Sequence, residues 1–422
     1  MNQNTTLISR SYLCLLGALL FGLLLTGVSR AESPEHDDDL TLNAQITLHS
    51  VLEQTIARYP DSRVLEAKRL EVEARGKHAR GWLPFAPAVG FRNQNDVITS
   101  GRGEREWEAD FEIPTWLPGQ RAAREAIAQD ALSGLTDSRD HLSLQVAGLL
   151  RDAIWDISMM TNQASLAESR HQTALALLHD VERRFKAGDL AKTDVMLAQN
   201  EVFQAETMKL RAEAEVKHAQ FRYTMLTGLK MLPLQISEAK SANSLDEQHP
   251  SLRDAAKKIL VADDERNLVR VERRENPSIF LNARSQRGAF DNQSNDSLGF
   301  KVRIPLESAT RSAPLLAGAE MNYARNQSDA MRLRYALETA FHEAEHNLEV
   351  TQAELAVVTR QQANAQDSLN LAKKAFSLGE IDLVNLLRVQ ALAYEAERAL
   401  RQRQIQLQWD TARYNQAVGE LP

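Results

Sequence analysis

The chain of 422 residues contains almost no cysteine. Its single cysteine, Cys14, lies in an apolar stretch near the N-terminus. Disulfide bonds, thiol catalysis and thiolate metal sites are therefore excluded from the rest of the chain. The sequence also lacks a recognisable Ser-His-Asp set and a phosphate-binding loop, so it predicts neither an enzyme nor a bound cofactor. Its formal net charge of −7 argues against a nucleic-acid partner.

The N-terminal segment has the pattern of an export signal. Residues 13–28 are almost wholly apolar, and Ser29 and Ala31 place small residues at the −3 and −1 positions of a cleavage site. The apolar run is too short and too rich in glycine for a typical membrane span, which needs about 20 apolar residues. We therefore expect residues 1–31 to be a signal peptide, with a retained anchor as the alternative. Residues 32–46 are expected to form a flexible leader.

Proline and glycine are scarce in two long parts of the chain. Proline is absent from residues 119–232 and 315–421. Gly188 is the only glycine between residues 149 and 227, and Gly379 is the only glycine between residues 319 and 418. Because proline breaks helices and glycine often ends them, each stretch predicts a helical hairpin that turns at its glycine. The first arm would be about 100 Å long at 1.5 Å per residue, and Asp189 and Glu380 would be early acids of the returning helices.

The sequence matches itself at an offset of 190 to 191 residues. The matching pairs are Pro60 with Pro250, Pro87 with Pro277, Ile113-Pro114 with Ile304-Pro305, Phe185 with Phe376, Gly188 with Gly379, and Gly228 with Gly419. The chain is therefore expected to contain a first repeat at 47–236, a polar linker at 237–248 and a second repeat at 249–422. Each repeat would consist of a helix, two strands and a long helical hairpin.

The expected strands are about ten residues long, which suits tilted strands that cross a bilayer. They are residues 87–97 and 105–115 in the first repeat and 277–287 and 297–306 in the second. Apolar side chains expected to face lipid are Trp107, Phe111, Ile113, Phe300, Val302 and Ile304. Charged side chains expected to alternate with them and face a lumen are Glu106, Glu108, Asp110, Glu112, Lys301 and Arg303.

Two questions about these strands stay open from the sequence. The carboxylates could give the lumen a preference for cations, or they could be neutralised across strands by Arg92, Arg284, Lys301 and Arg303. The strands could also form two soluble hairpins that cap a coiled coil. If they do lie in lipid, four strands are too few to close a barrel, so subunits must pool them.

The two turns share a Phe-x-x-Gly motif. Its residues and the polar residues that follow are Phe185, Gly188, Asp189 and Asp194 in the first copy, and Phe376, Gly379, Glu380, Asp382 and Asn385 in the second. Together with the passages 113–121 and 304–311, the pair resembles the TolC-type outer-membrane efflux family. The resemblance implies a mostly α fold with a small β part. In it, a homotrimer forms a twelve-stranded outer-membrane β-barrel that continues as a periplasmic α-helical barrel.

The resemblance also implies partners and a location. The chain would lie in the outer membrane of a Gram-negative bacterium, and its two turns would dock a periplasmic adaptor (membrane fusion) protein. The adaptor would connect it to an inner-membrane efflux pump of the RND type. The short mature chain without a lipidation cysteine resembles the heavy-metal branch, which exports cobalt, zinc and cadmium or copper and silver. The alternatives are a multidrug or type I secretion channel and, from a different class, a periplasmic adaptor or coiled-coil structural protein.

Two groups could in principle bind a metal ion. His342 and His346 lie four residues apart on an expected helix, a spacing that can hold a divalent metal. Residues 36–39 combine a histidine with three aspartates. A solvated helix face and a disordered leader explain the same residues, so no metal site is predicted.

Overall fold

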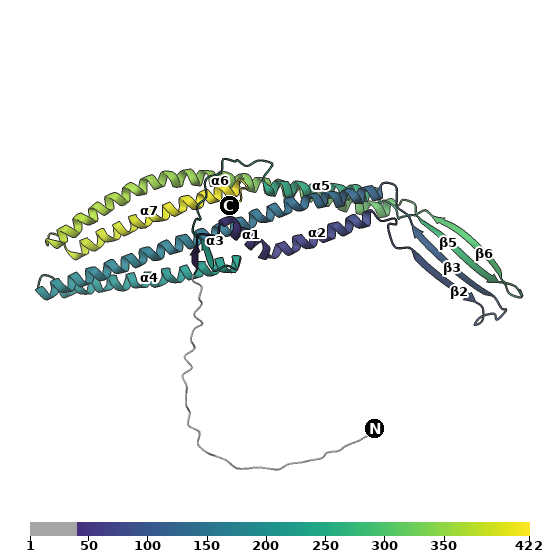
Figure 1. Ribbon diagram of the computed structural model, residues 1–422, viewed down its shortest axis with the longest axis horizontal. Coiled ribbons are helices and arrows are strands. Elements are labelled where there is room, and N and C mark those ends of the chain that lie inside the picture. Colours follow the sequence, from purple (N-terminus) through teal and green to yellow (C-terminus); the bar gives the residue numbers. More distant parts are fainter. Residues whose placement is uncertain (1–39) are drawn as a thin grey trace, which may run out of the picture. The chain divides into compact units, whose positions relative to one another are not determined.

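The computed structural model of the chain describes residues 40–422 (Figure 1). The predicted signal peptide, Cys14, most of the expected leader and the group at 36–39 lie outside the described residues. Within residues 40–422, no helix combines the length and the apolar character needed to cross a membrane.

The described unit contains two copies of the same succession of elements. The first copy comprises α1 (Leu48–Arg58), α2 (Pro60–Ala79), β2 (Ala88–Asn95), β3 (Arg105–Pro114), α3 (Gln120–Ala187) and α4 (Lys192–Thr227). The second comprises α5 (Pro250–Val271), β5 (Ser278–Arg287), β6 (Asn295–Arg303), α6 (Ala309–Ser377) and α7 (Leu383–Ala417). Two short strands, β1 (Thr41–Asn43) and β4 (Met231–Pro233), flank the first copy. The expected mostly α fold with a duplicated helix–strand–hairpin unit is confirmed.

The first helical segment begins and breaks where local chemistry requires it. Thr47 caps α1 through a reciprocal pair: the Ser50 N–H donates to Thr47 Oγ1 at 3.1 Å, and the Thr47 N–H donates to Ser50 Oγ at 3.0 Å. Tyr59 is extended, and Pro60 occupies the first position of α2. Proline is well suited to that position because the first helical N–H has no partner within the helix.

The long helices pair as two hairpins, α3 with α4 and α6 with α7, and α5 lies against both α3 and α6 (Figure 1). The largest hydrophobic cluster lies where α1, α3 and α4 meet. Val51, Leu52, Val146, Leu150 and Tyr223 are at most 1 % exposed there. The Tyr223 hydroxyl donates to the Met231 carbonyl at 2.9 Å, which joins this core to the segment after α4.

The expectation of a flexible leader at 32–46 is wrong for the part that the structure describes. Residues 41–43 form β1, which pairs in parallel with β4. Leu40 and Ile46 on either side pack against the main cluster. Burial of these apolar residues offsets the entropy of ordering the chain. A strand of three residues is too short for a period-two pattern to reveal it.

The stretch 237–248, expected to be a linker, is held by side chains of α3 and α7. Arg151 and Glu238 form an ion pair at 2.6 Å with both side chains buried. Asn415 donates to the Ala239 carbonyl at 2.9 Å and accepts the Ser241 N–H at 2.8 Å. These contacts fix the connection between the repeats against the end of the chain.

Candidate functional site

A four-stranded sheet combines the strands of both repeats. The order is β2-β3-β5-β6, and every neighbouring pair is antiparallel. The central pair aligns Arg105 with Arg287 and Pro114 with Ser278. Because side chains alternate along a strand and opposite residues share a face, this register divides the side chains of all four strands into two faces.

One face of the sheet is apolar and exposed. Its large exposed residues are Val89, Phe91, Trp107, Phe111, Leu281, Leu298, Phe300 and Val302. Leu298 is 90 % exposed and Phe91 81 %. Single apolar side chains are common on protein surfaces, but a contiguous set over a whole sheet face marks a surface that contacts lipid or protein.

The structure brings most of the predicted apolar set together on this face. Trp107, Phe111, Ile113, Phe300 and Val302 share it, and Ile304 follows directly after the end of β6. The predicted set lacked four of the large exposed members: Val89, Phe91, Leu281 and Leu298. The signal was present, because Val89 and Phe91 are two residues apart, as are Ile279 and Leu281, but polar neighbours made these strands look weak.

The other face carries the carboxylates of β3, and two of them have cationic partners. Arg284 Nε lies 2.9 Å from Glu106 Oε1, and Arg92 Nη1 lies 3.9 Å from Glu108 Oε2. Glu106 is buried by this contact, although the geometry is that of an ion pair and not of an aligned hydrogen bond. Cross-strand pairing therefore occurs and weakens the negative field of this face.

The remaining charged residues of the predicted set behave differently. Lys301 Nζ lies 5.0 Å from the centre of the Phe280 ring, and Arg303 pairs with Glu275 at 3.4 Å. Neither residue neutralises a carboxylate of β3. Asp110 lies opposite Gly90, where a Cβ would come within 2.4 Å of its Oδ1, so glycine leaves the space that this carboxylate occupies. Glu112 lies opposite Ala88 on the same face.

The sheet has two open edges. In the part of the chain that the structure describes, no strand pairs with the outer side of β2 or with the outer side of β6. The backbone N–H and C=O groups along these edges therefore lack a sheet partner, which in lipid would cost several kcal/mol per group.

The predicted turns connect the long helices at Gly188 and Gly379. Both glycines have positive φ, 89° and 75°, and no atom lies within 4 Å of the position of an added Cβ. The constraint is therefore backbone conformation and not space. The Asp189 N–H donates to Arg184 O at 3.0 Å, and the Glu380 N–H donates to Ala375 O at 2.9 Å, closing both helices.

The acids that begin the returning helices are not the ones expected. Asp189 and Glu380 lie in the turns, before the helices start at Lys192 and Leu383. Asp194 accepts the Ala191 N–H at 3.0 Å, and Asp382 is the N-cap of α7 and accepts the Asn385 N–H at 2.8 Å. Each returning helix begins four residues after its glycine, because an extended residue first reverses the chain.

The two turns differ in their surroundings. Phe376 is 5 % exposed in a cluster with Val181, Leu383 and Leu386, whereas Phe185 is 41 % exposed. Arg184 lies over the Phe376 ring at 4.9 Å and donates to its carbonyl at 3.0 Å. The first hairpin therefore contacts the second near the turns through Arg184, whereas Phe185 of the first hairpin remains accessible.

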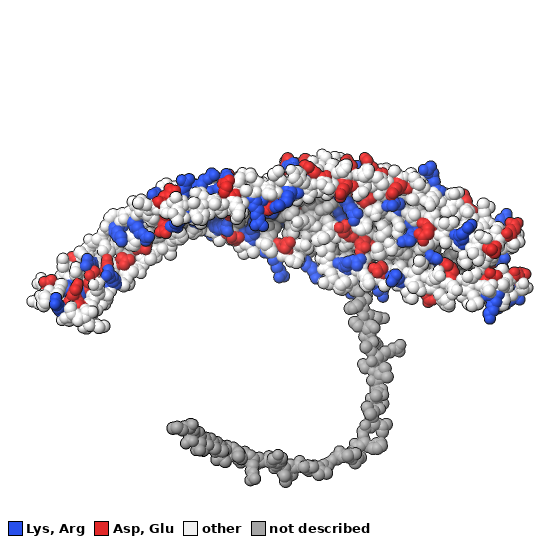
Figure 2. All heavy atoms as spheres, turned by 180° about the vertical axis from the view of Figure 1, so that it is seen from behind, with Lys and Arg blue, Asp and Glu red and all other residues white. Residues whose placement is uncertain are grey.

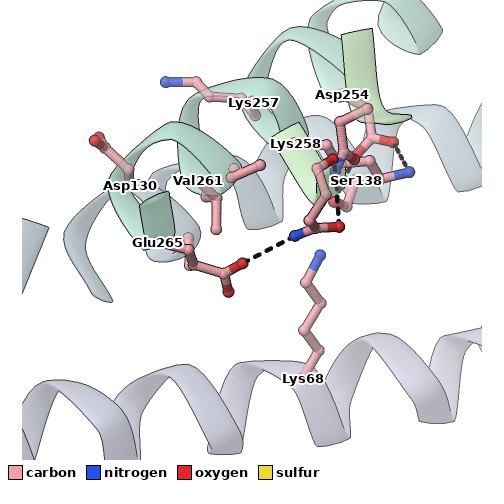
Figure 3. A pocket seen from close by; sticks show the side chains of 13 residues that line it. Lys68, Asp130, Ser138, Asp254, Lys257, Lys258, Val261 and Glu265 are labelled. Carbon is pink, nitrogen blue, oxygen red and sulfur yellow. Dashed lines mark hydrogen bonds and ion pairs between the residues drawn. The ribbon is translucent and has the colours of Figure 1, made fainter. Parts of the chain in front are cut away.

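A hollow of about 200 Å³ lies between α2, α3, α5 and α6 (Figure 3). Lys68 reaches into it from α2, the Ser138 hydroxyl donates to Asp254 at 2.6 Å, and the Asn322 amide donates to Glu265 at 3.2 Å. Its charged lining residues are three of each sign: Lys68, Lys257, Lys258, Asp130, Asp254 and Glu265. This balance favours neither cations nor anions. We therefore do not regard the hollow as an ion site.

The histidine pair on α6 provides only two ligands. The rings of His342 and His346 are parallel, with centroids 6.4 Å apart, and both side chains are exposed. Over residues 40–422, no group of three or more metal-binding side chains comes together. Charges of both signs are interspersed along the helices, as Figure 2 shows for one face.

Comparison with known proteins finds the same fold in solved outer-membrane proteins. No family model matches the sequence, and no curated protein matches it. The outer membrane protein VceC of Vibrio cholerae is 14 % identical over 88 % of this chain and 96 % of its own, with a TM-score of 0.71. The CmeC outer membrane channel of Campylobacter jejuni is 11 % identical over 89 % of this chain and 86 % of its own, with a TM-score of 0.71.

A third solved structure is that of CusC, described in connection with folding and transmembrane channel formation. It is 13 % identical over 90 % of this chain and 93 % of its own, with a TM-score of 0.72. Identities this low establish the fold alone. The fold of this chain is that of the TolC-type outer-membrane channels.

Proposed function

We propose that the chain is one subunit of a trimeric outer-membrane channel in a tripartite efflux system. The observation that carries the proposal is the four-stranded sheet with one exposed apolar face and two open edges. In lipid the open edges require further strands, and known barrels begin at about eight. Further copies of the same chain supply them, and three copies give the twelve-stranded barrel of channels with this fold.

The two faces of the sheet have different roles in this barrel. The apolar face with Trp107, Phe111 and Phe300 contacts lipid, and the face with Glu106, Glu108 and Lys301 lines the lumen. Trp82 and Phe85, which are 94 % and 58 % exposed, precede β2 and suit the aromatic girdle at the membrane surface.

The helices offer matching uncovered stripes for neighbouring copies. On α4 the stripe consists of Met196, Phe203, Leu210, Phe221 and Met225; on α6 it consists of Met331, Tyr335, Val350, Val357 and Leu371. All are exposed in the single chain, at spacings built from steps of three and four residues, as in packed helices. Their burial between copies would form the periplasmic α-helical barrel below the membrane.

The turn residues suit the docking of a periplasmic adaptor protein. Phe185, Leu378 and the backbone around Gly188 and Gly379 are accessible at the ends of the hairpins. The adaptor connects the channel to an inner-membrane pump of the RND type. We propose heavy-metal cations as the exported substrate, as the resemblance to the heavy-metal branch implies.

Assembly can be tested on protein extracted from outer membranes. Native mass spectrometry in detergent should give a trimer, and planar bilayers should show discrete channel conductance. A folded monomer that inserts into lipid would refute the proposal. Replacing Phe111 with Asp should reduce the trimer, whereas Phe111→Leu should leave it intact, because only the first change places a charge in lipid.

Docking and substrate can be tested in cells. A mature chain without cysteine permits single-cysteine variants, and Asp189→Cys and Glu380→Cys should crosslink to the adaptor. Gln361→Cys serves as the control, because this exposed position on α6 lies 18 residues before Gly379 and therefore away from the turn. Deletion of the gene should raise sensitivity to cobalt, zinc, cadmium, copper or silver salts. Sensitivity to organic drugs alone would instead support a multidrug channel.

A further inference from the structure

Two histidines meet where the second repeat begins. His249 is the N-cap of α5: its Nδ1 accepts the Ser251 N–H at 3.2 Å, and its side chain is among the most buried in the unit. His141 of α3 places Nδ1 2.9 Å from the Ser251 hydroxyl oxygen. One serine therefore contacts both imidazoles: its N–H is capped by His249 within α5, and its hydroxyl joins α5 to α3 through His141.

The hydrogen bonds of His249 define its protonation state. Because Nδ1 accepts a hydrogen bond, it carries no proton, so the neutral ring bears its proton on Nε2. Nε2 is buried and has no partner among residues 40–422. A second proton would have to bind Nδ1, where it would face the Ser251 N–H, another donor. Protonation therefore removes the cap of α5 and also places a charge in a buried site.

The surroundings do not compensate for such a charge. Gly419 packs on His249: its φ is +84°, and an added Cβ would lie 2.9 Å from the His249 Cδ2 and 2.8 Å from Pro250 Cδ. The C-terminal segment therefore closes over the ring, and little room remains for the ring to move toward water.

The charged groups around the pair come from every neighbouring element. They are Asp137 and Asp140 of α3, Asp246 before α5, Arg253, Asp254 and Lys258 of α5, Glu343 of α6, and Asp410 and Arg413 of α7. Most of the carboxylates are already engaged. Asp254 accepts from Ser138 and from Lys258, each at 2.6 Å; Asp137 and Asp140 share Arg253; Asp410 accepts from Thr351 at 2.8 Å.

The balance of these effects favours neutral rings. Burial lowers the pKa of His141, with Asp254 opposing the shift and Lys258 adding to it. Burial also lowers the pKa of His249, and the neighbouring His141 and Arg253 add to the shift against Asp246. A histidine in the unfolded chain titrates near 6.5. The stabilisation is therefore present above about pH 6.5 and is lost as the pH falls from there toward the lowered folded-state pKa.

We propose that His141 and His249 form an acid-sensitive latch between the repeats. At neutral pH the latch holds the first turn of α5 against α3 and the C-terminal segment. In acid the protonated His249 no longer accepts the Ser251 N–H, and the first turn of α5 loses its cap. This proposal concerns the single chain and does not depend on the channel function.

Hydrogen–deuterium exchange of the full chain in detergent tests the latch. After correction for intrinsic rates, the amides of Leu252 and Arg253 should exchange at least about tenfold faster at pH 5.5 than at pH 7.5. His249→Asn should flatten this difference, because the Asn Oδ1 can accept the Ser251 N–H and does not titrate. His141→Asn should reduce it. The exposed His179→Asn is the matched control and should behave as wild type. An unchanged pH profile in His249→Asn overturns the proposal.

A second measurement needs no variant. Exchange at the imidazole C2 position, followed by mass spectrometry, gives the pKa of each histidine in the wild-type protein. His141 and His249 should titrate below the ordinary histidine value of about 6.5. Titration of both with ordinary pKa values would show that the pair is structural only and would refute the latch, even if the variants failed to fold.

Discussion

The first helix of each hairpin, α3 in one repeat and α6 in the other, has nearly the same length but a very different environment. α3 spans 68 residues and buries 18 of them, whereas α6 spans 69 residues and buries five. The reason is contact: α3 lies against α1, α2, α4, α5 and α7, whereas α6 lies mainly against α5 and α7 and touches α3 near the turns. A duplicated sequence has therefore given one internal helix and one with a free side.

In the proposed trimer, this difference indicates where a further copy of the chain would pack. The repeats are alike in the sheet, where each contributes one inner and one outer strand, and they are unlike in the helices. The exposed apolar stripe of α6 has no counterpart on α3, although α4 of the first repeat also carries such a stripe. Each of the following predictions compares a residue with its counterpart in the other repeat.

The largest expected effect is at Arg151, whose counterpart 191 residues later is His342. Arg151→Met leaves the buried Glu238 without its partner and should lower the free energy of unfolding by about 3–5 kcal/mol. His342→Met should leave it almost unchanged, because this side chain is exposed. Thermal unfolding followed by circular dichroism measures both. The double variant Arg151→Met, Glu238→Met should recover most of the loss, and failure to do so would mean that the ion pair is not the cause.

In the sheet, by contrast, equivalent substitutions in the two repeats should have equal effects. Phe111→Asp and its counterpart Val302→Asp each place a carboxylate on the apolar face, at a cost of about 1–4 kcal/mol depending on depth in the bilayer. Trimer yield from outer membranes is the measurement. A strong effect at one position and none at the other would show that the two repeats do not share one lipid-facing surface.

Much of the fold could be predicted from the sequence because its signals are local and repeated. Missing proline, single glycines and the constant offset predict two hairpins, and the alternation of apolar and charged residues predicts the strands. The turns at Gly188 and Gly379 needed only the rule that glycine tolerates positive φ. These features depend on short windows of sequence and on one comparison of the chain with itself.

Other features could not be predicted because they depend on contacts between distant segments. Nothing near Glu238 indicates that Arg151 reaches it, and β1 gains its order from β4, about 190 residues away. The different exposure of Phe185 and Phe376 has the same origin, since identical motifs meet different neighbours. The pairing of Glu106 with Arg284 follows from a register that only the structure defines.

Substitution of either turn glycine should strain its turn by a similar amount and leave the rest of the molecule intact. Gly188→Val and Gly379→Val force a β-branched residue into positive φ, which costs about 1–3 kcal/mol. Gly318→Val in α6, which has no positive φ and free space around it, is the control. We expect trimers to persist in the membrane while resistance to the exported compound falls. Normal export with intact adaptor crosslinking would show that the turns are not docking sites.

The smallest effect concerns a charge that only the second repeat carries. At the offset of 190 residues, Asp264 of α5 corresponds to Ala74 of α2. Burial, followed by a hydrogen bond and repulsion from Asp130, raises the pKa of Asp264 to about 6. Because the folded state binds this proton more tightly than the unfolded chain, the contribution to stability is full below about pH 4 and is lost as the pH rises through 6.

Asp264→Asn should therefore stabilise the protein at pH 7.5 by about 1 kcal/mol or less, since water screens a partly exposed pair. It should also remove the decline in thermal midpoint between pH 4 and 6. The neighbouring Asp263 pairs with Arg266 and also adds to the repulsion on Asp264, so Asp263→Asn should reduce the pH dependence without removing it. This slope is opposite to that of the histidine latch on the same helix, so the two sites can be separated by sign. If Asp264→Asn leaves the pH dependence unchanged, the repulsion between Asp264 and Asp130 does not weaken the contact of α5 with α3. The helix α5 of the second repeat would then pack on α3 no less stably than α2 of the first repeat.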